Sequence, residues 1–566
     1  MISLYTFVAE GSSTLHLLQG LLAIVVTVLC AQILRLFRRS RNLPFPPGPR
    51  PSAIPFVGNI ADMPSSHDWK TFYEWGQVYG TDCLGSRDQV AFMDTRVGPL
   101  LMVEVMGQKI CIINSYEVAN DLLNDRSLIY SDRPAMHMVN DLMDWKFNMG
   151  LQSYGPMYKK HRKVFQHGFN RRESNGYQHV QTRENTLLLE KLLTDPSKYD
   201  HHLRITTGAI IMMIGLGYQV VENDEFVRIA EAAQLAMVSA ARPGAYLVDL
   251  LPILRYVPEW FPGASFQKVA REGRELSQEL QTKPFAWALK QFDEGTALPS
   301  FFKDLMEHKK IASDDPEEAQ HIIKCATAVM YATGADTILA STLTFILAML
   351  HAPQVQKIAQ EELDRVVGTD RLPTYANREE LPYINAIVKE SLRWELVIPL
   401  GVPHRAMEDD VSSGFSVCAF SLPEDYFLKT YNGYFIPKGT TIIANQWGIS
   451  HDEQVFSDPF AFRPERFLDK ESPLPDPSTI AFGWGRRICP GRFLAENSLW
   501  LHVATILACF NITPVVGDDG KPIIPPREYT SGMASRPLPF QCRIDPRNDA
   551  AVELIKQSVA ALPESY

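Results

Sequence analysis

Hydrophobic residues recur with helical spacing through the middle of the chain, from about residue 115 to about residue 400. Two shorter stretches, residues 101–113 and 433–444, instead carry valine, isoleucine, tyrosine and turn residues in the pattern of short β-strands. After about residue 50 the sequence contains no linker, no low-complexity stretch and no internal repeat. The pattern therefore predicts one compact domain that is mainly α-helical, with a small β-sheet region.

The N-terminal region has a different pattern. Residues 14–34 are nearly free of charge and are long enough to cross the hydrocarbon core of a bilayer as a helix. Four arginines between residues 35 and 41 follow directly, and such a positive flank places the C-terminal side of a membrane span in the cytosol. No small-residue cleavage site follows the apolar run, so we expect a retained single-pass transmembrane anchor and not a removed signal peptide.

This anchor sets the expected organisation of the chain. Residues 1–13 would form a short lumenal segment and residues 14–34 the transmembrane helix. Residues 35–50 would form a basic flank and a stiff hinge, because four prolines fall between residues 44 and 49. Residues 51–566 would then form the folded domain on the cytosolic side.

Composition excludes some classes of function. The 566 residues are 46% hydrophobic, which is enough to bury a large core. The formal net charge of −10 leaves no basic footprint for nucleic acid. The eight cysteines are scattered, without the close pairs of a zinc site or of a secreted disulfide framework, and this favours a reducing compartment.

The longest helical run extends from about residue 320 to residue 351, just before Pro353. It contains Gly334, Asp336 and Thr337 in an otherwise apolar stretch. A glycine inside a helix costs about 1 kcal/mol, and a carboxylate or a hydroxyl in apolar surroundings adds a further cost. A mild kink beside a core threonine would explain these residues, and so would a functional group, so the pattern alone leaves both interpretations open.

Near the C-terminus a lone cysteine, Cys489, lies among glycines and arginines in the sequence Phe-Gly-Trp-Gly-Arg-Arg-Ile-Cys-Pro-Gly. The glycines let the backbone approach a flat macrocycle and turn its N–H groups toward the sulfur. Arg486, Arg487 and a helix expected to start near Pro490 favour the thiolate, which is the form that binds a metal. The alternative is a buried structural cysteine in a glycine-rich turn, but the full spacing favours a thiolate ligand to a heme iron.

This segment resembles the heme-binding signature of the cytochrome P-450 family, F-x-x-G-x-R-x-C-x-G, at every fixed position. The resemblance covers about residues 45 to 545. It implies the cytochrome P-450 fold and a heme b cofactor, with Cys489 as the axial ligand of the iron. It also implies that Phe482, Arg487 and Gly491 contact the heme.

The same resemblance gives a role to the polar residues of the long helix. Ala-Thr-Gly-Ala-Asp-Thr, residues 332–337, is similar to the oxygen-activating motif of the family. In that motif Gly334 and Thr337 would open a groove over the iron, and Asp336 would help to relay protons. Asp336 and Thr337 are therefore the expected catalytic residues. Thr333 stands where the family more often has alanine.

One further match is structural. Glu390 and Arg393 match the E-x-x-R helix of the family, and Arg466 matches the arginine that completes its buried charged triad. The helix that carries the pair is too apolar to be fully exposed, so we expect these three residues to stabilise the fold and to take no part in catalysis.

Cationic residues elsewhere in the chain are expected to contact the heme propionates. Tyr158 and Arg162 resemble the W-x-x-x-R helix of the family, with tyrosine in place of tryptophan. A phenol can still donate one hydrogen bond. Either His404 or Arg405 would supply a further contact, and the sequence leaves that choice open.

The resemblance also implies a function: a monooxygenase that uses O2 to oxidise an apolar small molecule at the endoplasmic reticulum membrane. The chain has no flavin or nicotinamide fingerprint, so electrons would come from NADPH through a separate NADPH-cytochrome P-450 reductase. The segments around Cys489 and residues 403–410 are most similar to fungal natural-product oxygenases of the O-methylsterigmatocystin oxidoreductase-like kind. This similarity favours a role in secondary metabolism.

Two alternative functions share the same cysteine loop. One is a non-oxygenating or peroxide-using member of the fold, although such members often lack the acid–threonine pair formed here by Asp336 and Thr337. The other is a heme-binding sensor or a catalytically impaired isoform, which would hold heme without turnover.

Two segments make the chain longer than its motifs require. Residues 411–429 separate an acidic turn from the hairpin that normally follows it, and they begin with Val-Ser and end with Lys. GTAAGT can encode Val-Ser and AAG can encode Lys, so the ends of the block are compatible with those of an intron. Its apolar content also suits an exposed loop poorly, although a long surface loop costs little entropy. We predict that residues 411–429 are translated intron, with residues 83–99 as a weaker second case.

Overall fold

The computed structural model of the chain describes residues 45–54, 57–79, 99–242, 244–411, 434–469, 471 and 473–563. The expected anchor, its lumenal segment, residues 35–44 and nearly all of both suspected insertions lie outside the described residues. The chain divides into two units. One unit comprises residues 46–410 and 436–566 and contains all the features discussed below, whereas the other consists almost wholly of residues outside the described ranges.

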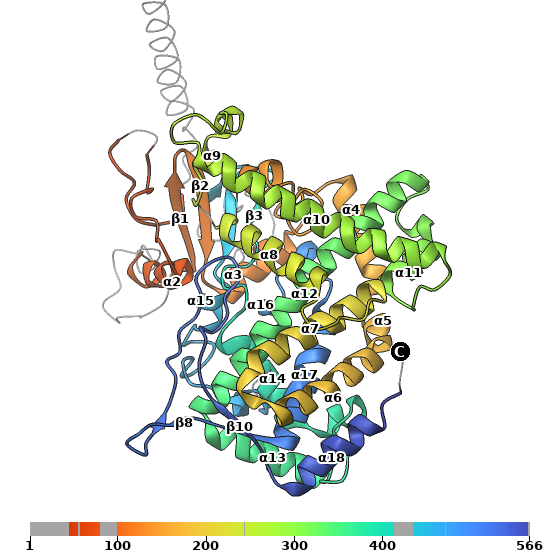
Figure 1. Cartoon of the computed structure of the whole chain (residues 1–566). Helices are drawn as coiled ribbons and strands as arrows, with labels where there is room; N and C mark the ends of the chain where they lie inside the picture. Colours follow the sequence, from red (N-terminus) through yellow and green to blue (C-terminus); the bar gives the residue numbers. More distant parts are fainter. Residues whose placement is uncertain are drawn as a thin grey trace, which may run out of the picture. The chain divides into compact units, whose positions relative to one another are not determined.

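The predicted mainly α-helical fold is confirmed (Figure 1). The helices are α2 (Asp68–Tyr79), α3 (Tyr116–Ala119), α4 (Pro156–Gly168), α5 (Arg171–Gly176), α6 (Gln178–Thr194), α7 (Tyr199–Leu216), α8 (Glu225–Ala240), α9 (Leu247–Leu250), α10 (Ser265–Asp293), α11 (Phe301–Glu307), α12 (Pro316–His351), α13 (Pro353–Val366), α14 (Pro382–Trp394), α15 (Gln446–Ser450), α16 (Ser478–Ala481), α17 (Arg492–Cys509) and α18 (Asp549–Ala560). Short 3-10 and π turns connect several of them.

The long central helix, α12, begins at Pro316, where Asp315 caps it by accepting a hydrogen bond from the backbone N–H of Glu317. It ends at His351, as predicted, because the backbone cannot continue into Pro353 as one regular helix. Among the described residues it is the one helix long and apolar enough to cross a membrane, but 67% of its most apolar window is buried inside the protein. It is therefore a core helix.

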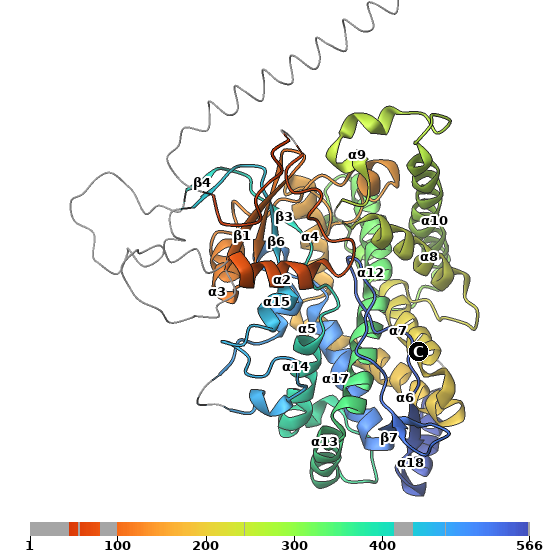
Figure 2. The same ribbon diagram turned by 90° about the vertical axis from the view of Figure 1, so that its left-hand side faces the viewer.

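Two hydrophobic clusters share α12. Its first part, up to Ile338, packs in one cluster with residues of α7, α8 and α10. Its second part, from Leu339 onward, packs in the other with residues of α14 and α17. In Figure 2, α12, α14 and α17 run side by side through the helical part of the unit. Residues 333–337, where the polar motif lies, are less buried than either part and fall between the two clusters.

The small sheet region is also confirmed. The strands are β1 (Leu100–Val105), β2 (Gln108–Ile113), β3 (His404–Arg405), β4 (Asp410–Val411), β5 (Phe435–Ile436), β6 (Thr441–Ala444), β7 (Phe510–Thr513), β8 (Val515–Val516), β9 (Pro522–Ile523) and β10 (Arg543–Pro546). The main sheet has the order β1-β2-β6-β3. Its β1 and β2 are antiparallel, β2 and β6 are parallel, and β3 pairs antiparallel with β6 through His404 and Ile442.

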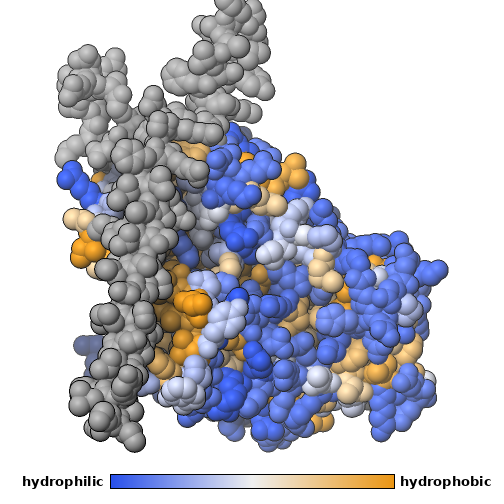
Figure 3. Space-filling view, turned by 90° about the horizontal axis from the view of Figure 1, so that it is seen from above, coloured by the Kyte–Doolittle hydropathy of each residue, from blue (hydrophilic) through white to orange (hydrophobic). Residues whose placement is uncertain are grey.

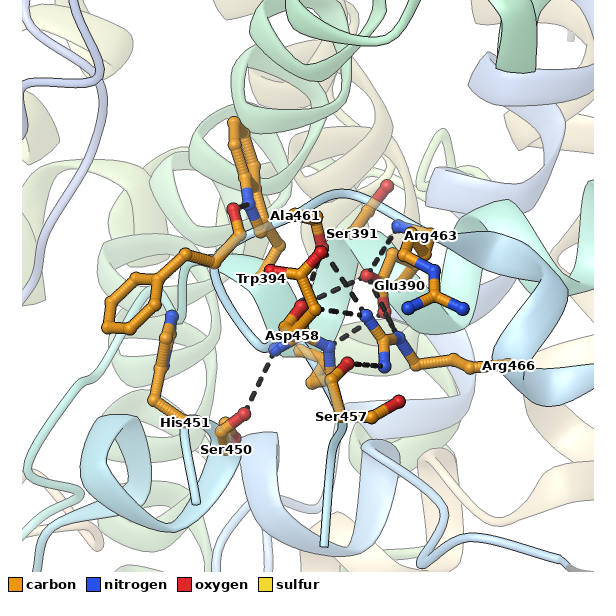
Figure 4. A network of polar contacts seen from close by, with 12 residues as sticks. Glu390, Ser391, Trp394, Ser450, His451, Ser457, Asp458, Ala461, Arg463 and Arg466 are labelled. Carbon is orange, nitrogen blue, oxygen red and sulfur yellow. Dashed lines mark hydrogen bonds and ion pairs between the residues drawn. The ribbon is translucent and has the colours of Figure 1, made fainter. Parts of the chain in front are cut away.

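The predicted charged triad is confirmed as a buried network (Figure 4). Arg393 donates to both carboxylate oxygens of Glu390, at 2.7 and 2.8 Å, and neither side chain has any exposed surface. Arg466 reaches the same carboxylate at 3.3 Å, and the backbone N–H of Arg463 donates to it at 2.8 Å. The remaining guanidinium N–H groups donate to backbone carbonyls, including that of Ser450. The network joins α14 to the segment before the Cys489 loop.

The backbone on the two sides of the suspected insertion at residues 411–429 is joined by hydrogen bonds. The N–H of Lys438 donates to the carboxylate of Asp409 at 2.8 Å, and the N–H of Gly439 donates to the carbonyl of Ala406 at 2.8 Å. Chain that leaves and re-enters the fold at one place can be shortened without pulling the fold apart.

We therefore expect a variant that lacks residues 411–429 to fold and to retain its heme at least as well as the full chain. Sequencing of the transcript should show copies from which this block has been spliced. The yield of heme-loaded protein from both forms gives a second measurement. Messenger RNA that carries the block in most copies, together with a poorly folded shortened protein, would show that the segment is a genuine loop.

Candidate active site

A cavity of about 330 Å³ lies beside residues 333–338 of α12. Its wall brings together residues that are far apart in the sequence. The residues predicted from the sequence that line it are Tyr158, Arg162, Thr337, His404, Phe482, Arg487, Cys489 and Gly491. Two predicted residues, Asp336 and Arg405, are not on its wall. The other lining residues are mainly apolar.

The Cys489 loop takes its shape from two glycines with positive φ, Gly483 at 79° and Gly485 at 52°. A Cβ atom at Gly485 would lie 2.1 Å from the carbonyl oxygen of Leu123, so this position accepts only glycine without a backbone shift. The loop closes through a hydrogen bond from the N–H of Cys489 to the carbonyl of Phe482, at 2.8 Å. Helix α17 then begins at Arg492, with Gly491 as its N-cap residue. These features hold the sulfur at the cavity wall and next to a helix N-terminus.

Opposing effects act on the Cys489 thiol. Burial raises its pKa above the usual value of a thiol, although the backbone N–H of Gly491 and the charges of Arg162 and Arg492 act in the opposite direction. The cations that favour the thiolate are therefore Arg162 and Arg492, not the adjacent Arg486 and Arg487 named from the sequence. The arrangement has the donor set and positive charge that a thiolate ligand requires.

Four basic side chains face the cavity without a carboxylate partner among the described residues: Arg133, Arg162, His404 and Arg487. Arg487 is buried and donates to the carbonyls of Ser131 and Gln152, at 2.6 and 2.8 Å. Such bonds satisfy N–H groups but do not neutralise the charge.

Arg133, like Arg487, is buried and, within the described part of the chain, is bonded only to backbone carbonyls. It donates to the carbonyls of Gly150, Val402 and Pro403 at 2.6 to 2.9 Å. Burial lowers its pKa well below the usual value, and the nearby charge of Arg487 lowers it further. A cluster of buried cations without acidic partners is costly unless an anionic group lies against it. The two propionates of a heme would supply that charge, so the residues present fit the cofactor.

Tyr158 supports this cluster indirectly. Its hydroxyl donates to the backbone carbonyl of Arg486 at 2.5 Å, so it is engaged within the protein. The guanidinium of Arg487 lies over its ring, with the central carbon 3.8 Å from the ring centroid. The ring fixes Arg487 against the cavity, and Arg162, one helical turn further along α4, donates to the carbonyl of Ile488.

The choice between His404 and Arg405 follows from the sheet, since neighbouring residues of a strand point to opposite faces. His404 lines the cavity, and its Nδ1 atom donates to the carbonyl of Tyr130 at 2.7 Å. Burial lowers the pKa of His404 well below its usual value, with Arg133 and Arg487 adding to the effect. Arg405 instead pairs with Asp132. The position therefore favours His404, whose Nε2 atom would donate to a propionate in the imidazolium form that this anion would stabilise.

The two expected catalytic residues of α12 also point in different directions. Thr337 lines the cavity, and its hydroxyl donates to the carbonyl of Thr333 at 3.1 Å. Asp336 points away, with 30% of its side chain exposed and an oxygen 3.8 Å from Arg204 on α7. A Cβ atom at Gly334 would lie 2.8 Å from Ile211 of α7, so the glycine also permits close helix packing.

Sequence reasoning missed Arg133 as a cation of the site. It lies in a short Asp-Arg-Pro sequence that has no family motif around it, and only the fold brings it beside Arg487. The role of Asp132 was missed for the same reason: this carboxylate forms its ion pair with Arg405, and it acts on Arg133 and Arg487 only through its nearby charge.

Comparison with known proteins agrees with this geometry. The profile of the cytochrome P450 family matches residues 47–425 and 428–543. The chain is 39% identical to a cytochrome P450 monooxygenase of Armillaria gallica, over 95% of this chain and 99% of that protein. It is 38% identical to a cytochrome P450 monooxygenase of Postia placenta, over 92% of this chain and 93% of the relative. It is also 34% identical to the tryptamine 4-monooxygenase of Psilocybe cyanescens, over 92% and 96% respectively.

The chain therefore belongs to the cytochrome P450 family of heme-thiolate monooxygenases and is of the fungal type. Its cofactor is an iron heme.

Proposed function

We propose that the protein is a membrane-anchored monooxygenase of fungal secondary metabolism that inserts one oxygen atom from O2 into an apolar small molecule. The observation that carries this proposal is the placing of Cys489, the cation cluster and Thr337 on the wall of one mainly apolar cavity. When bound, the heme supplies the electron transfer and oxygen chemistry, for which a thiolate ligand favours O–O cleavage.

The residues of the chain would divide the remaining work. Cys489 would hold the iron, and Arg133, Arg162, His404 and Arg487 would hold the propionates. Apolar residues of α8 and α12 would exclude water around the substrate.

Thr337 and Asp336 would move protons. Thr337 carries its hydroxyl at the cavity, while Asp336 lies on the partly exposed side of α12, next to Arg204 and within reach of solvent. A carboxylate at the surface and a hydroxyl at the cavity can pass protons inward through water.

Loss of either group should uncouple electron use from oxygenation. Asp336→Asn and Thr337→Ala are expected to retain heme and to release more peroxide per NADPH, by on the order of tenfold, because a positioned proton donor contributes at least that factor. Peroxide and NADPH are measured together with purified reductase. Thr327→Ala, on α12 but away from the cavity wall, is the control and should behave as wild type. Unchanged coupling in both Asp336→Asn and Thr337→Ala would reduce the motif to a packing feature.

The electron donor would dock near the Cys489 loop. A surface depression there is lined by Lys159, Arg162, Arg486 and Arg492, together with Pro490. Such a basic surface suits the acidic face of a separate flavoprotein, NADPH-cytochrome P-450 reductase. Lys160, the next residue along α4, is not on this surface and is paired with Glu318. NADPH consumption that requires purified reductase and falls with added salt tests this partner, and it also separates turnover from simple heme binding.

Membrane attachment has support beyond the apolar run at residues 14–34. Between residues 247 and 261, five large hydrophobic side chains are at least half exposed, from 50% for Phe261 to 81% for Trp260. They belong to α9, to the 3-10 helix Pro252–Tyr256 and to the turn that follows. Figure 3 shows the side of the molecule on which α9 lies in Figure 1, with hydrophobic patches set in a largely hydrophilic surface. Exposed tryptophan, tyrosine and aliphatic residues suit the lipid interface.

Deletion of residues 1–41 is therefore expected to release the protein from carbonate-washed membranes without loss of heme, since every residue of the cavity wall lies beyond this segment. Some reversible binding to lipid vesicles should remain through the exposed residues of 247–261. Extraction of the full-length chain by the carbonate wash would contradict a membrane span at residues 14–34.

A further inference from the structure

Most polar side chains on the cavity wall already have their hydrogen bonds within the fold. The hydroxyls of Thr333 and Ser391 donate to carbonyls of their own helices. Glu395, the one acidic residue on the described wall, accepts from Arg527 and Trp447. These groups are satisfied without a ligand.

Two glutamines of the described wall make no hydrogen bond, Gln234 and Gln446. The carbonyl oxygen of Gln446 is enclosed by protein, so this side chain offers a ligand only its N–H groups and is unable to accept from a hydroxyl. Gln234 as a whole residue is 8% exposed, and neither of its side-chain polar atoms is enclosed in this way. The carboxamide of Gln234 therefore remains available to a molecule in the cavity.

A glutamine is unusual at position 234, because this position lies on the buried side of α8. The inward stripe of the helix contains Ala230, Ala233 and Met237, whereas Leu235 on the other side is 69% exposed. Gln234 is the polar member of an inward stripe that otherwise favours apolar residues. The cavity residues nearest to it in sequence, Met237 and Val238, are also apolar. A leucine would bury more apolar surface at this position and so favour the folded state, which makes a carboxamide unexpected unless a ligand uses it.

We propose that Gln234 determines substrate specificity by hydrogen-bonding one neutral polar group, a hydroxyl or a carbonyl, on an otherwise apolar substrate. A carboxamide can donate to a carbonyl or accept from a hydroxyl. We take the substrate to be neutral, because the one described acidic side chain on the wall is paired with Arg527 and the basic side chains on the wall are those assigned to the heme propionates. This bond would fix the orientation of the apolar skeleton and so the carbon that is oxidised. The proposal rests on the proposed oxygenase function and specifies its substrate class.

Binding of a matched pair of probes tests the proposal. Bicyclohexyl and 4-cyclohexylcyclohexanol differ by one hydroxyl, and their binding to the heme-loaded protein is followed by the change in the heme absorption spectrum. Wild type is expected to bind the alcohol about fivefold more tightly relative to the hydrocarbon than the Gln234→Leu variant does, as one neutral hydrogen bond contributes roughly that factor. Met237→Leu, on the same wall, is the control for shape and should keep the wild-type ratio. An equal ratio in wild type and Gln234→Leu would overturn the proposal.

Stability of the ligand-free protein gives a second, independent readout. If Gln234 serves a ligand, Gln234→Leu should unfold at the same urea concentration as wild type or at a higher one. A clear decrease would show that the amide has a structural partner, and would equally overturn the proposal. Both outcomes leave the oxygenase function intact, because that function fails only if the wild-type protein lacks a thiolate-ligated heme or consumes no NADPH with reductase.

Discussion

The Cys489→Ser variant is expected to lose thiolate ligation of the heme completely, so that its reduced carbon monoxide complex no longer absorbs at about 450 nm. Cys489 is the one described cysteine on the cavity wall, and no other thiol in that part of the chain can replace it. The band is measured by difference spectroscopy on the purified protein. A hydroxyl in place of the thiol is a far weaker ligand, and heme content should also fall.

Cys325→Ala provides the matched control. Cys325 is a buried thiol of α12 that does not line the cavity, and burial raises its pKa to about 12. This variant should keep the band. Retention of the band by Cys489→Ser would show that another residue holds the iron.

Replacement of Glu390 by glutamine is expected to prevent stable folding. The change leaves Arg393 and Arg466 as buried cations without the carboxylate they share, and the loss of one partner from a buried ion pair costs about 3–5 kcal/mol. That cost is a large part of a total unfolding free energy of roughly 5–15 kcal/mol. Because Arg463 also binds this carboxylate through its backbone N–H, the segment leading to the Cys489 loop should loosen and heme should be lost.

The neighbouring residue on α14 supplies the control. Lys389 pairs with Asp476 at 2.9 Å, but about two fifths of each side chain is exposed. Lys389→Met should change the unfolding free energy by no more than about 1 kcal/mol. Urea unfolding and the yield of soluble protein compare the two variants, and equal stability of Glu390→Gln and Lys389→Met would contradict a structural role for the triad.

The sequence predicted the elements better than the directions of side chains. The end of α12 followed from Pro353, but its start was placed about four residues late, because the capping residues Asp315 and Pro316 precede the apolar pattern. Successive residues of a helix point about 100° apart, and in this helix Thr337 lines the cavity whereas Asp336 does not. The motif identified both residues, whereas only the packing of α12 against α7 shows which one faces outward.

The cation cluster shows a limit of a different kind. The family motifs placed Arg162, Arg487 and one of His404 and Arg405 at the heme, but no motif indicated that Arg133 joins them. His404 and Arg405 were expected as alternatives. Neighbouring residues of a β-strand point to opposite faces of the sheet, so only one of the two side chains can face the cavity. In the structure Arg405 pairs with Asp132, 273 positions away in the chain, and this contact favours His404.

The most direct test of the monooxygenase function can be made before the substrate is identified. Heme-loaded protein, purified reductase and NADPH are incubated with a neutral extract of fungal metabolites under ¹⁶O2 or ¹⁸O2, and the products are compared by mass spectrometry. We expect a product that gains one labelled oxygen atom from ¹⁸O2 and that is absent with Cys489→Ser. A protein with intact heme that gives no such product, or a product whose new oxygen comes from water, would contradict the assignment.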